Sequence, residues 1–397
     1  MKNVFRKAVL ATVNNNVGGY AMNTFLTTGD LNNDGRPDLI VSGWDGRMVW
    51  LENRGERAWI EHVIDPAVKD VECGGSLIDL TGNGYLDVIC GSASGGAVWW
   101  WENPGAGDRP WPKHTILQPG SGYFHDTATG RISPNDPLHL FLNHQDPPNG
   151  ATVYSIPIPA DPTCSPWPGA QVIASQQSEA LVGPDGSVLK HQAEEGLAIG
   201  DIDGDGQNEI VSGTSWFKYQ NAAWHRYKFA QGYITNKAVI GDVDGDGKNE
   251  IVLSEGDPMI YGKTQGGRLG WFKPGADITE LWAEHILDDG LLDAHSLVLG
   301  DVCRQGRLDI LTAEIGWADE NRGYKRRAPW VLLFENLGSG RFARHIIDQG
   351  TGAHEGVLAD LRGSGRLDFV CKPLHGPDRW NIVALLNDQI ILPDFAI

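Results

Sequence analysis

The chain has 397 residues, of which 41% are hydrophobic and 21% charged, so it carries enough apolar sequence for a large core and is not a disordered chain. Its 32 Lys and Arg against 51 Asp and Glu give a formal net charge of −19, which argues against nucleic acid or an anionic membrane as the main partner. The sequence contains no run of 18 apolar residues, so no membrane span is predicted. No convincing signal-peptide cleavage site follows the N-terminus, and we therefore expect a cytoplasmic protein.

One short pattern recurs along the whole chain. Each copy has an apolar run, a polar turn that usually opens with Gly-Asp, and a second apolar run that begins after an acidic residue. In chain order, the residues that open the seven turns are Asp30, Asp79, Arg131, Asp201, Asp242, Asp301 and Asp360. Self-similarity at intervals of several tens of residues predicts a stacked or radial array of equivalent units.

Two further short strands are expected after most turns. Third strands are clear at 48–53, 98–103, 269–275 and 331–336, and fourth strands at 59–64, 111–117, 282–287 and 342–347. Four short β-rich runs per unit, bounded by Gly, Asp and Asn, are typical of a propeller blade.

The last copy of the pattern lacks a clear fourth strand, whereas the segment at 5–12 has the missing pattern. We therefore predict that the N-terminal segment completes the last blade, which closes the ring and removes a free sheet edge. The expected fold is all-β: a seven-bladed β-propeller with four-stranded blades, forming a single domain over residues 1–397.

Three of the turns place oxygen-bearing side chains at alternating positions, which is the arrangement of a calcium-binding loop. The predicted calcium ligands are Asp30, Asn32, Asp34 and Asp38 in the first turn, Asp201, Asp203, Asp205 and Glu209 in the fourth, and Asp242, Asp244, Asp246 and Glu250 in the fifth. The remaining turns offer fewer oxygens and are predicted to bind calcium poorly. These ions would be structural, and a plain polar turn is the alternative interpretation.

One position in each repeat is predicted to face the ring axis, at the end of the inner strand opposite the turn. Its occupants, each six residues before a turn opener, are Thr24, Cys73, His125, Glu195, Asn236, His295 and His354. We predict that His125, His295 and His354, together with Glu195, bind a divalent metal ion (Zn, Mg or Mn) that acts as a Lewis acid. The alternative is a polar plug of the central channel.

Histidines also recur on the fourth strands, at His62, His114, His285 and His345. Because this recurrence is regular, we assign these four to packing within and between blades. His139 and His225 lie inside predicted strands and are assigned in the same way.

Loops on the axial face add residues suited to a sugar, whose apolar face stacks on aromatic rings while its hydroxyls find polar partners. The predicted substrate-binding residues are Trp44, Trp216, Glu314, Trp317 and Glu355, and the candidate catalytic residues are His191, Tyr123, His144, His375 and Lys372. We favour His191 as the general base. The inserts at 145–194 and 315–330 exceed ordinary loop length, as functional lids often do.

The Asp-rich turns resemble the FG-GAP/VCBS repeat family over almost the whole chain. The order of the blades, the segment from Glu335 to Ile346 and the central histidines also resemble the propeller of the fungal aldos-2-ulose dehydratase family, also called anhydrofructose dehydratases. That resemblance implies a metal-assisted elimination from a keto-sugar. Some polysaccharide lyases also use β-propellers with central His and Tyr residues.

We therefore predict a metal-dependent sugar lyase or dehydratase that performs β-elimination on a keto-sugar or a uronic-acid-type carbohydrate. A non-catalytic carbohydrate- or protein-binding propeller is the main alternative. A glycoside hydrolase is a third possibility, because Glu195 with Glu314 or Glu355 offers a pair of carboxylates. The particular sugar and the oligomeric state are left open by the sequence.

Overall fold

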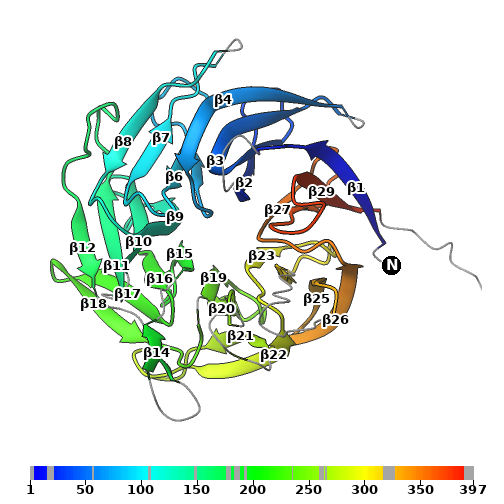
Figure 1. Ribbon diagram of the computed structural model, residues 1–397. Helices are drawn as coiled ribbons and strands as arrows, with labels where there is room; N and C mark the ends of the chain where they lie inside the picture. The colour runs from blue at the N-terminus through cyan, green and yellow to red at the C-terminus, as the bar shows by residue number, and fades with distance from the viewer. Residues whose placement is uncertain are drawn as a thin grey trace, which may run out of the picture.

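The computed structural model describes residues 4–15, 22–55, 58–105, 109–146, 150–175, 180–182, 188–191, 195–234, 236–258, 263, 266–315 and 327–388. These residues form a ring of seven antiparallel blades around a central axis, as Figure 1 shows. The predicted seven-bladed β-propeller with four-stranded blades is confirmed. In the described part of the chain, no helix is long and apolar enough to cross a membrane.

Within each blade the strands follow one another from the axis outwards in chain order, except that the last blade ends with the N-terminal strand. Blade 1 contains β2 (Met22–Gly29), β3 (Asp38–Asn53) and β4 (Trp59–Asp70); blade 2 contains β5 (Ser76–Ile78), β6 (Asp87–Gly91), β7 (Val98–Trp101) and β8 (Lys113–Leu117); blade 3 contains β9 (Tyr123–Gly130), β10 (His139–Asp146), β11 (Gly150–Pro157) and β12 (Gln171–Ala174); blade 4 contains β15 (Leu197–Gly200), β16 (Glu209–Ser212), β17 (Ser215–Gln220) and β18 (Ala223–Lys228). Blade 5 contains β19 (Asn236–Gly241), β20 (Glu250–Glu255), β21 (Gly267–Lys273) and β22 (Ala283–Leu291); blade 6 contains β23 (Ser296–Gly300), β24 (Asp309–Ala313), β25 (Trp330–Gly338) and β26 (Arg341–Gln349); blade 7 contains β27 (Glu355–Ala359), β28 (Asp368–Lys372), β29 (Asn381–Asn387) and β1 (Phe5–Thr12). The prediction that residues 145–194 form a long insert was wrong, because this stretch contains β11 and β12, the third and fourth strands of blade 3. A separate hairpin of β13 (Ala180–Val182) and β14 (Val188–His191) follows them.

Blade 1 has four strands because its long element β3 folds back on itself. The first half of β3 pairs with β2 and the second half with β4. The two ends of β3 also meet, since the backbone N–H of Asn53 donates to Oδ1 of Asp38 at 2.8 Å. The ends of a straight strand of this length would lie about 50 Å apart. The fold-back occurs near Asp45, whose φ of 46° lies in the left-handed region that Asp tolerates better than most residues.

The N-terminal strand closes the ring, as predicted. β1 pairs antiparallel with β29, with Phe5 opposite Asn387 at one end and Thr12 opposite Asn381 at the other. Because β1 is the outermost strand of blade 7, the two ends of the propeller chain are held in the same sheet (Figure 1). Closure fixes the blades relative to one another, and with them the side chains that reach the axis.

The apolar core lies between neighbouring blades. Successive side chains of a strand point to opposite faces, so Val41 packs towards Val370 of blade 7 while Ile40 packs towards Val88 of blade 2. All four side chains are fully buried. Burying one such side chain stabilises the fold by roughly 1.5–3 kcal/mol. The alternating apolar pattern read from the sequence is therefore the pattern that joins the blades.

The acidic turns fasten one blade to the next through backbone hydrogen bonds. Asp38 accepts from the backbone N–H of Leu31 at 3.0 Å and from that of Asn53 at 2.8 Å, and Nδ2 of Asn53 donates to the carbonyl of Leu361 in the neighbouring blade at 2.9 Å. The same inter-blade bond recurs from Asn103 to Leu31, from Asn336 to Val243 and from Asn387 to Val302. The turn acid and the Asn that ends the third strand therefore act as one structural unit.

The fourth-strand histidines are structural, as predicted. The ring of His62 stacks on Trp50 with centroids 4.5 Å apart, and its Nε2 lies 2.9 Å from Oε2 of Glu52. His114 and His285 stack on Trp100 and Trp271 in the same way, at 4.3 and 3.9 Å. These rings pack against the third strand of their own blade, away from the axis.

Candidate metal centre at the propeller axis

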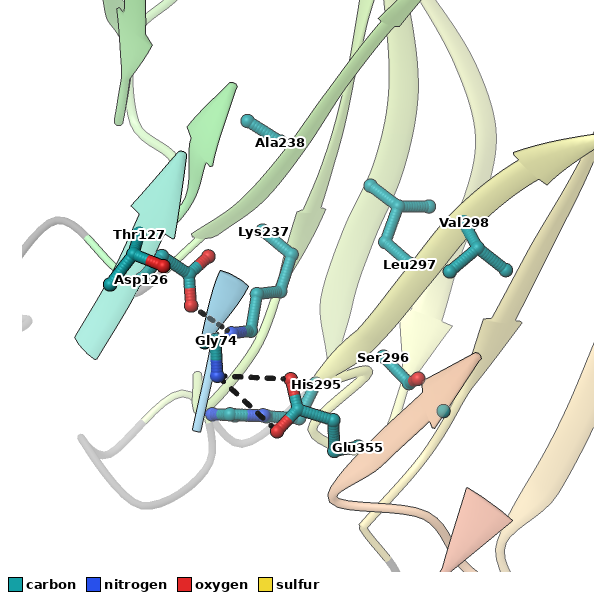
Figure 2. Close-up of a pocket in the computed structure, with 12 residues that line it drawn as sticks. Gly74, Asp126, Thr127, Lys237, Ala238, His295, Ser296, Leu297, Val298 and Glu355 are labelled. Carbon is teal, nitrogen blue, oxygen red and sulfur yellow. Dashed lines mark hydrogen bonds and ion pairs between the residues drawn. The ribbon is translucent and has the colours of Figure 1, made fainter. Parts of the chain in front are cut away.

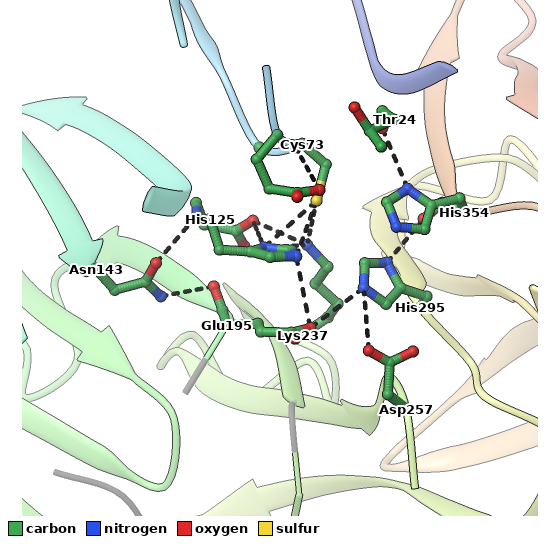
Figure 3. Close-up of polar contacts among 12 residues, drawn as sticks. Thr24, Cys73, His125, Asn143, Glu195, Lys237, Asp257, His295 and His354 are labelled. Carbon is green, nitrogen blue, oxygen red and sulfur yellow. Dashed lines mark hydrogen bonds and ion pairs between the residues drawn. The ribbon is translucent and has the colours of Figure 1, made fainter. Parts of the chain in front are cut away.

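The starts of the inner strands bring several of the predicted axial residues together (Figure 3). His125 lies in β9, while Cys73, Glu195, His295 and His354 each stand just before the inner strand of their blade. These five side chains and that of Thr24 are buried. We call these six residues and the neighbours that contact or group with them, Glu72, Asp126, Lys237 and Asp257, the axial cluster. The side chain of Asn236 lies outside the described residues. Residues that are far apart in the sequence become neighbours here because the ring is closed.

Each of the three histidines is held by a contact between its Nδ1 and an oxygen atom. Nδ1 of His125 lies 2.9 Å from Oδ1 of Asp126, Nδ1 of His295 lies 2.9 Å from the carbonyl oxygen of His354, and Nδ1 of His354 lies 3.1 Å from the carbonyl oxygen of Thr24. Each of these oxygens can accept a hydrogen bond from Nδ1–H, which leaves the lone pair on Nε2. An Nδ1–H bound to a carboxylate or a carbonyl is the usual support of a metal-binding histidine.

Glu195 faces two of these histidines. Its Oε2 lies 3.2 Å from Nε2 of His295 and 3.6 Å from Nε2 of His125, and the residue is only 4% exposed. This oxygen has no hydrogen bond from the described residues, although the carboxyl group as a whole is hydrogen-bonded by the side chain of Gln145. A buried carboxylate oxygen without a partner is costly, and a bound cation removes that cost. The donors therefore fit a metal ion at this point.

The protonation of the cluster also favours a cation. Burial lowers the pKa of all three histidines, that of His295 to about 3 and that of His354 well below its ordinary value, so the imidazoles are neutral near pH 7. Neutral imidazole is the form that binds metal. Burial raises the pKa of Glu195, so the uncompensated carboxylate is disfavoured until a positive charge is placed beside it.

The structure divides the predicted three-histidine set. The donor atoms of Cys73, His125 and His295 all lie within 4.8 Å of one another, whereas His354 shares such a group with Glu72 and Cys73. The ring of His354 instead stacks on that of His295, with centroids 4.2 Å apart. The sequence prediction of metal ligands did not include Cys73, although Cys73 had been placed at the axial position of its blade.

Two further acidic residues lie in the cluster that were not predicted as metal ligands. Glu72 stands directly before Cys73, and Asp257 follows β20, where its Oδ2 lies 3.9 Å from Nε2 of His295. Burial raises the pKa of Glu72 to about 7. The sequence shows that Glu72 lies beside an axial residue, because it directly precedes Cys73. It does not show this for Asp257, which reaches the axis only through the path of the loop after β20.

A cavity of about 160 Å³ lies next to the cluster, along the inner strands (Figure 2). His295, Lys237 and Glu355 contribute to its wall. Nζ of Lys237 donates to Oδ1 of Asp126 at 2.8 Å, and Glu355 accepts from the backbone N–H of Gly74 at 3.2 Å. Burial alone would lower the pKa of Lys237, but the carboxylate of Asp126 outweighs it, so the ammonium stays charged. Burial raises the pKa of Glu355 to about 7, so this carboxyl can exchange a proton near neutral pH.

The predicted catalytic residues fall in different places. Lys372 is fully buried, its Nζ donates to the carbonyl oxygen of Asn23 at 2.6 Å, and burial lowers its pKa to about 8. His144 is held by a stack on Phe124 at 4.4 Å and by a contact of 2.7 Å from its Nε2 to the carbonyl of Ser121, so its ring is already engaged. Tyr123 begins β9 and is partly exposed, and His375 is half-buried near Lys372. His191 ends β14, but its side chain lies outside the described residues.

Two of the predicted substrate-binding residues have structural roles instead. Trp216 is 1% exposed and belongs to the apolar core between blades 4 and 5, so its ring is not available to a sugar. Glu314 is fully buried, and its oxygens accept from Arg327 and from the backbone N–H groups of Leu292 and Trp330. Both assignments are therefore corrected. Of the others, Trp44 is half-buried at the fold-back of β3, Glu355 reaches the cavity, and Trp317 lies outside the described residues.

The two most acidic turns contain a lysine where a calcium ion was expected. Nζ of Lys218, from the third strand of blade 4, contacts Asp203, Asp205 at 2.7 Å and Glu209 at 3.1 Å. Lys273 of blade 5 contacts Asp244 and Asp246 in the same way, the latter at 2.7 Å. An ammonium and a calcium ion cannot share these oxygens, so calcium would have to displace each lysine.

The first turn differs from those two. Asp30 accepts the backbone N–H groups of Asp34 and Gly35 at 3.1 and 2.8 Å, and Asn32 donates to Oε1 of Glu52 at 3.0 Å. The third strand here supplies an acid rather than a lysine. The sequence grouped the three turns by their alternating oxygen-bearing side chains. In the structure, the residue contributed by the third strand separates the first turn, with Glu52, from the other two, with Lys218 and Lys273.

Comparison with known proteins supports the fold. No protein-family model matches the chain, and no curated protein matches it. Among solved structures, the chain is similar to BBS1N in a crystal structure of its complex with ARL6DN, with 10% identity, a TM-score of 0.56, and coverage of 98% of this chain and 99% of that one. It is also similar to the V. cholerae biofilm matrix protein Bap1, with 11% identity, a TM-score of 0.51, and coverage of 96% and 91%. At such identities the similarity shows the propeller fold alone.

Proposed function

We propose that the chain is a metal-dependent carbon–oxygen lyase that acts on a carbohydrate at the axial cluster. The main support is the position of Glu195 Oε2, buried between the Nε2 atoms of His125 and His295 and without a hydrogen bond from any described residue. A polar plug would pair such an oxygen with a donor. Three donors that leave one side open are typical of a catalytic metal site rather than a structural one.

His125, His295 and Glu195 would hold the ion, which would polarise a carbonyl or carboxylate oxygen and so make the neighbouring C–H more acidic. Glu355, in the wall of the adjacent cavity, would accept that proton, and its pKa of about 7 suits a general base. The C–O bond to the β-hydroxyl or glycosidic oxygen would then break, and the departing oxygen would take up a proton and leave as water or an alcohol. Lys237 remains protonated in the same wall and can donate a hydrogen bond to a sugar oxygen. Lys372, with a pKa of about 8, is a second candidate for proton transfer.

The size of the cavity bears on the substrate. Its volume of about 160 Å³ is close to that of an engineered cavity that holds benzene, so it admits no more than the reacting part of a sugar. A keto-sugar and a uronic-acid-type carbohydrate both place a carbonyl or carboxylate beside the C–H bond that must break. The reaction class is therefore proposed for both kinds of substrate.

Two alternatives remain for the experiment to separate. A glycoside hydrolase needs two available carboxylates, and Glu314 is not available because Arg327 and two backbone N–H groups occupy its oxygens. Glu195 with Glu355 is the pair that remains. A binding propeller is the other alternative: BBS1N, which shares the fold, was crystallised in a complex with ARL6DN.

The test combines metal analysis with an ultraviolet assay. Purified protein should contain about one divalent transition metal ion per chain, and addition of keto-sugars or uronides should produce the absorbance of an enone or an unsaturated sugar. Glu195→Gln should remove most of the metal and the activity, whereas Glu280→Gln, on an exposed turn, should change neither. Metal without absorbance on any sugar would favour a binding propeller, and new reducing ends without absorbance would favour a hydrolase.

A further inference from the structure

Cys73 is the least expected member of the axial cluster. It is fully buried, and its Sγ lies 3.0 Å from Nε2 and 3.4 Å from Nδ1 of His125. Its donor atom, together with those of His125 and His295, forms a group within 4.8 Å (Figure 3). The cysteine therefore faces Nε2 of His125, which Glu195 also faces.

We propose that Cys73 is a ligand of the axial metal ion and that the resulting Cys-His-His-Glu site takes zinc in preference to magnesium or manganese. This inference rests on the metal-binding part of the proposed function and adds the identity of the ion and of its fourth protein ligand.

A second and independent observation points to a ligand at this place. Oε2 of Glu195, on the other side of the two histidines, is buried and has no hydrogen-bond partner among the described residues. A tetrahedral ion with bonds of 2.0–2.1 Å requires its N and O donors to lie about 3.3 Å from one another. The distances from Oε2 to His295 and His125 are 3.2 and 3.6 Å, which bracket that value. These two distances are those expected between ligands of one small ion. Cys73 and Glu195 belong to two different groups of donor atoms, Cys73 with His125 and Glu195 with Asp257, and His295 is shared by both groups.

The surroundings of Cys73 can support a bound thiolate. A coordinated thiol loses its proton to the medium as the metal–sulfur bond forms. The ammonium of Lys237 lies 3.8 Å from Sγ and can donate to the thiolate, which would support it from outside the coordination sphere.

The donor chemistry selects the metal. Magnesium and manganese prefer oxygen ligands, whereas a set of one sulfur, two nitrogens and one oxygen is a zinc set. One thiolate and one carboxylate also balance the two charges of the ion, so the buried site carries no net charge once it is filled. With four protein ligands in place, a substrate oxygen would bind by expanding the coordination to five or by displacing Glu195.

Cobalt(II) provides a direct readout, because a thiolate ligand gives it an intense charge-transfer band in the near ultraviolet. The full chain, freed of metal and loaded with cobalt, should show this band, and Cys73→Ser should lose the band while keeping weaker visible bands from the remaining ligands. Cys164→Ser, at a half-buried cysteine away from the cluster, should keep the band in full. Zinc affinity should fall at least about tenfold in Cys73→Ser, as expected for a lost ligand.

The outcomes separate this inference from the proposed function. Cobalt that binds to the wild type without the charge-transfer band, or a band that survives in Cys73→Ser, would overturn the role of Cys73 and leave the metal site standing. A wild-type chain that binds neither zinc nor cobalt would overturn both. If Cys73→Ser fails to fold, the band in wild type and in Cys164→Ser, together with competition of zinc against magnesium and manganese, decides the question.

Discussion

Acidic groups lie at both ends of the inner strands, at the turns and at the axis, but the two sets differ in the partners that compensate their charge. At the turns, most acids have partners: Asp38 accepts from two backbone N–H groups, and Asp203 and Asp205 bind Lys218. Oε1 of Glu250 has no hydrogen bond from the described residues, but it lies 4.0 Å from Nζ of Lys273. At the axis, Oε2 of Glu195 has no hydrogen bond from any residue that the structure describes. An acidic group whose charge is compensated by other residues of the chain has a structural role, whereas a buried acidic group without such a partner indicates a binding site for a ligand.

The comparison also bears on the acidic sequence motifs, for which calcium binding stays a prediction: carboxylates of the turns at Asp201 and Asp242 lie close enough together to hold an ion. The turns at Asp201 and Asp242 are the most acidic stretches of the sequence, yet each contains its own cation. The axial cluster is spread over several blades and includes no short motif, yet it holds the carboxylate that lacks a partner. Local density of ligand-type residues therefore carried less information here than the supply of counter-charges from neighbouring strands.

The largest expected effect comes from removing an axial imidazole. His295→Ala should lower metal affinity more than about a hundredfold, because the loss of a ligand exceeds the 10–100-fold loss seen for outer-shell partners. Metal content measured beside a thermal melt tests this. The matched control is His285→Ala, on the fourth strand of blade 5, where the ring stacks on Trp271; this variant should keep its metal. Equal metal content in the two variants would contradict the assignment of metal binding to the axial histidines.

A structural acid of a turn should affect stability alone. Asp38→Ala leaves the buried N–H groups of Leu31 and Asn53 without acceptors, and we expect a loss of about 2–4 kcal/mol of unfolding free energy. Denaturant unfolding of the metal-loaded protein measures it. Metal content at the axis should stay at the wild-type level, and a parallel loss of metal would mean that turns and axis are coupled.

Replacing the internal lysine should create the calcium dependence that the sequence predicted. In Lys218→Met, Asp203, Asp205 and Glu209 lose their counter-charge, so we expect a loss of about 1–2 kcal/mol in chelator that calcium restores. The wild type and the exposed Lys248→Met control should melt at the same temperature with and without calcium. A wild type that is destabilised by chelator as strongly as Lys218→Met would show that calcium displaces the lysine.

The smallest effect concerns pH. Burial raises the pKa of Glu209 to about 7, above its ordinary value of 4.5, so the folded state holds this proton more tightly than the unfolded state does. The contribution of Glu209 to stability is therefore complete below about pH 4.5 and is lost as the pH rises towards 7, with a slope of at most about 1.4 kcal/mol per pH unit. Glu209→Gln should flatten the stability curve between pH 5 and 7. An unchanged slope in urea titrations at pH 5, 6 and 7 would contradict this.

The periodicity of the sequence was sufficient to predict the fold, because the blades repeat one pattern of apolar runs and polar turns. The N-terminal strand could be assigned to blade 7 because its pattern was the one missing from the last repeat, and β1 does pair with β29. The fourth-strand histidines could be assigned to packing for the same reason. By contrast, Trp216 and Glu314 were misassigned because the sequence places them at a strand end without showing that one ring packs into the core and one carboxylate meets Arg327.

The sequence by itself determined the number of blades, the closure of the ring and the position in each blade that faces the axis, because these follow from patterns within single repeats. The tertiary structure decided which axial side chains meet. It joined Cys73 to His125 and His295, brought in Asp257, separated His354 into another group, and placed Lys218 and Lys273 inside turns that the sequence assigned to calcium. The physical reason is that counter-charges and donor distances depend on neighbouring strands and blades, whose side chains come within reach only when the ring has closed.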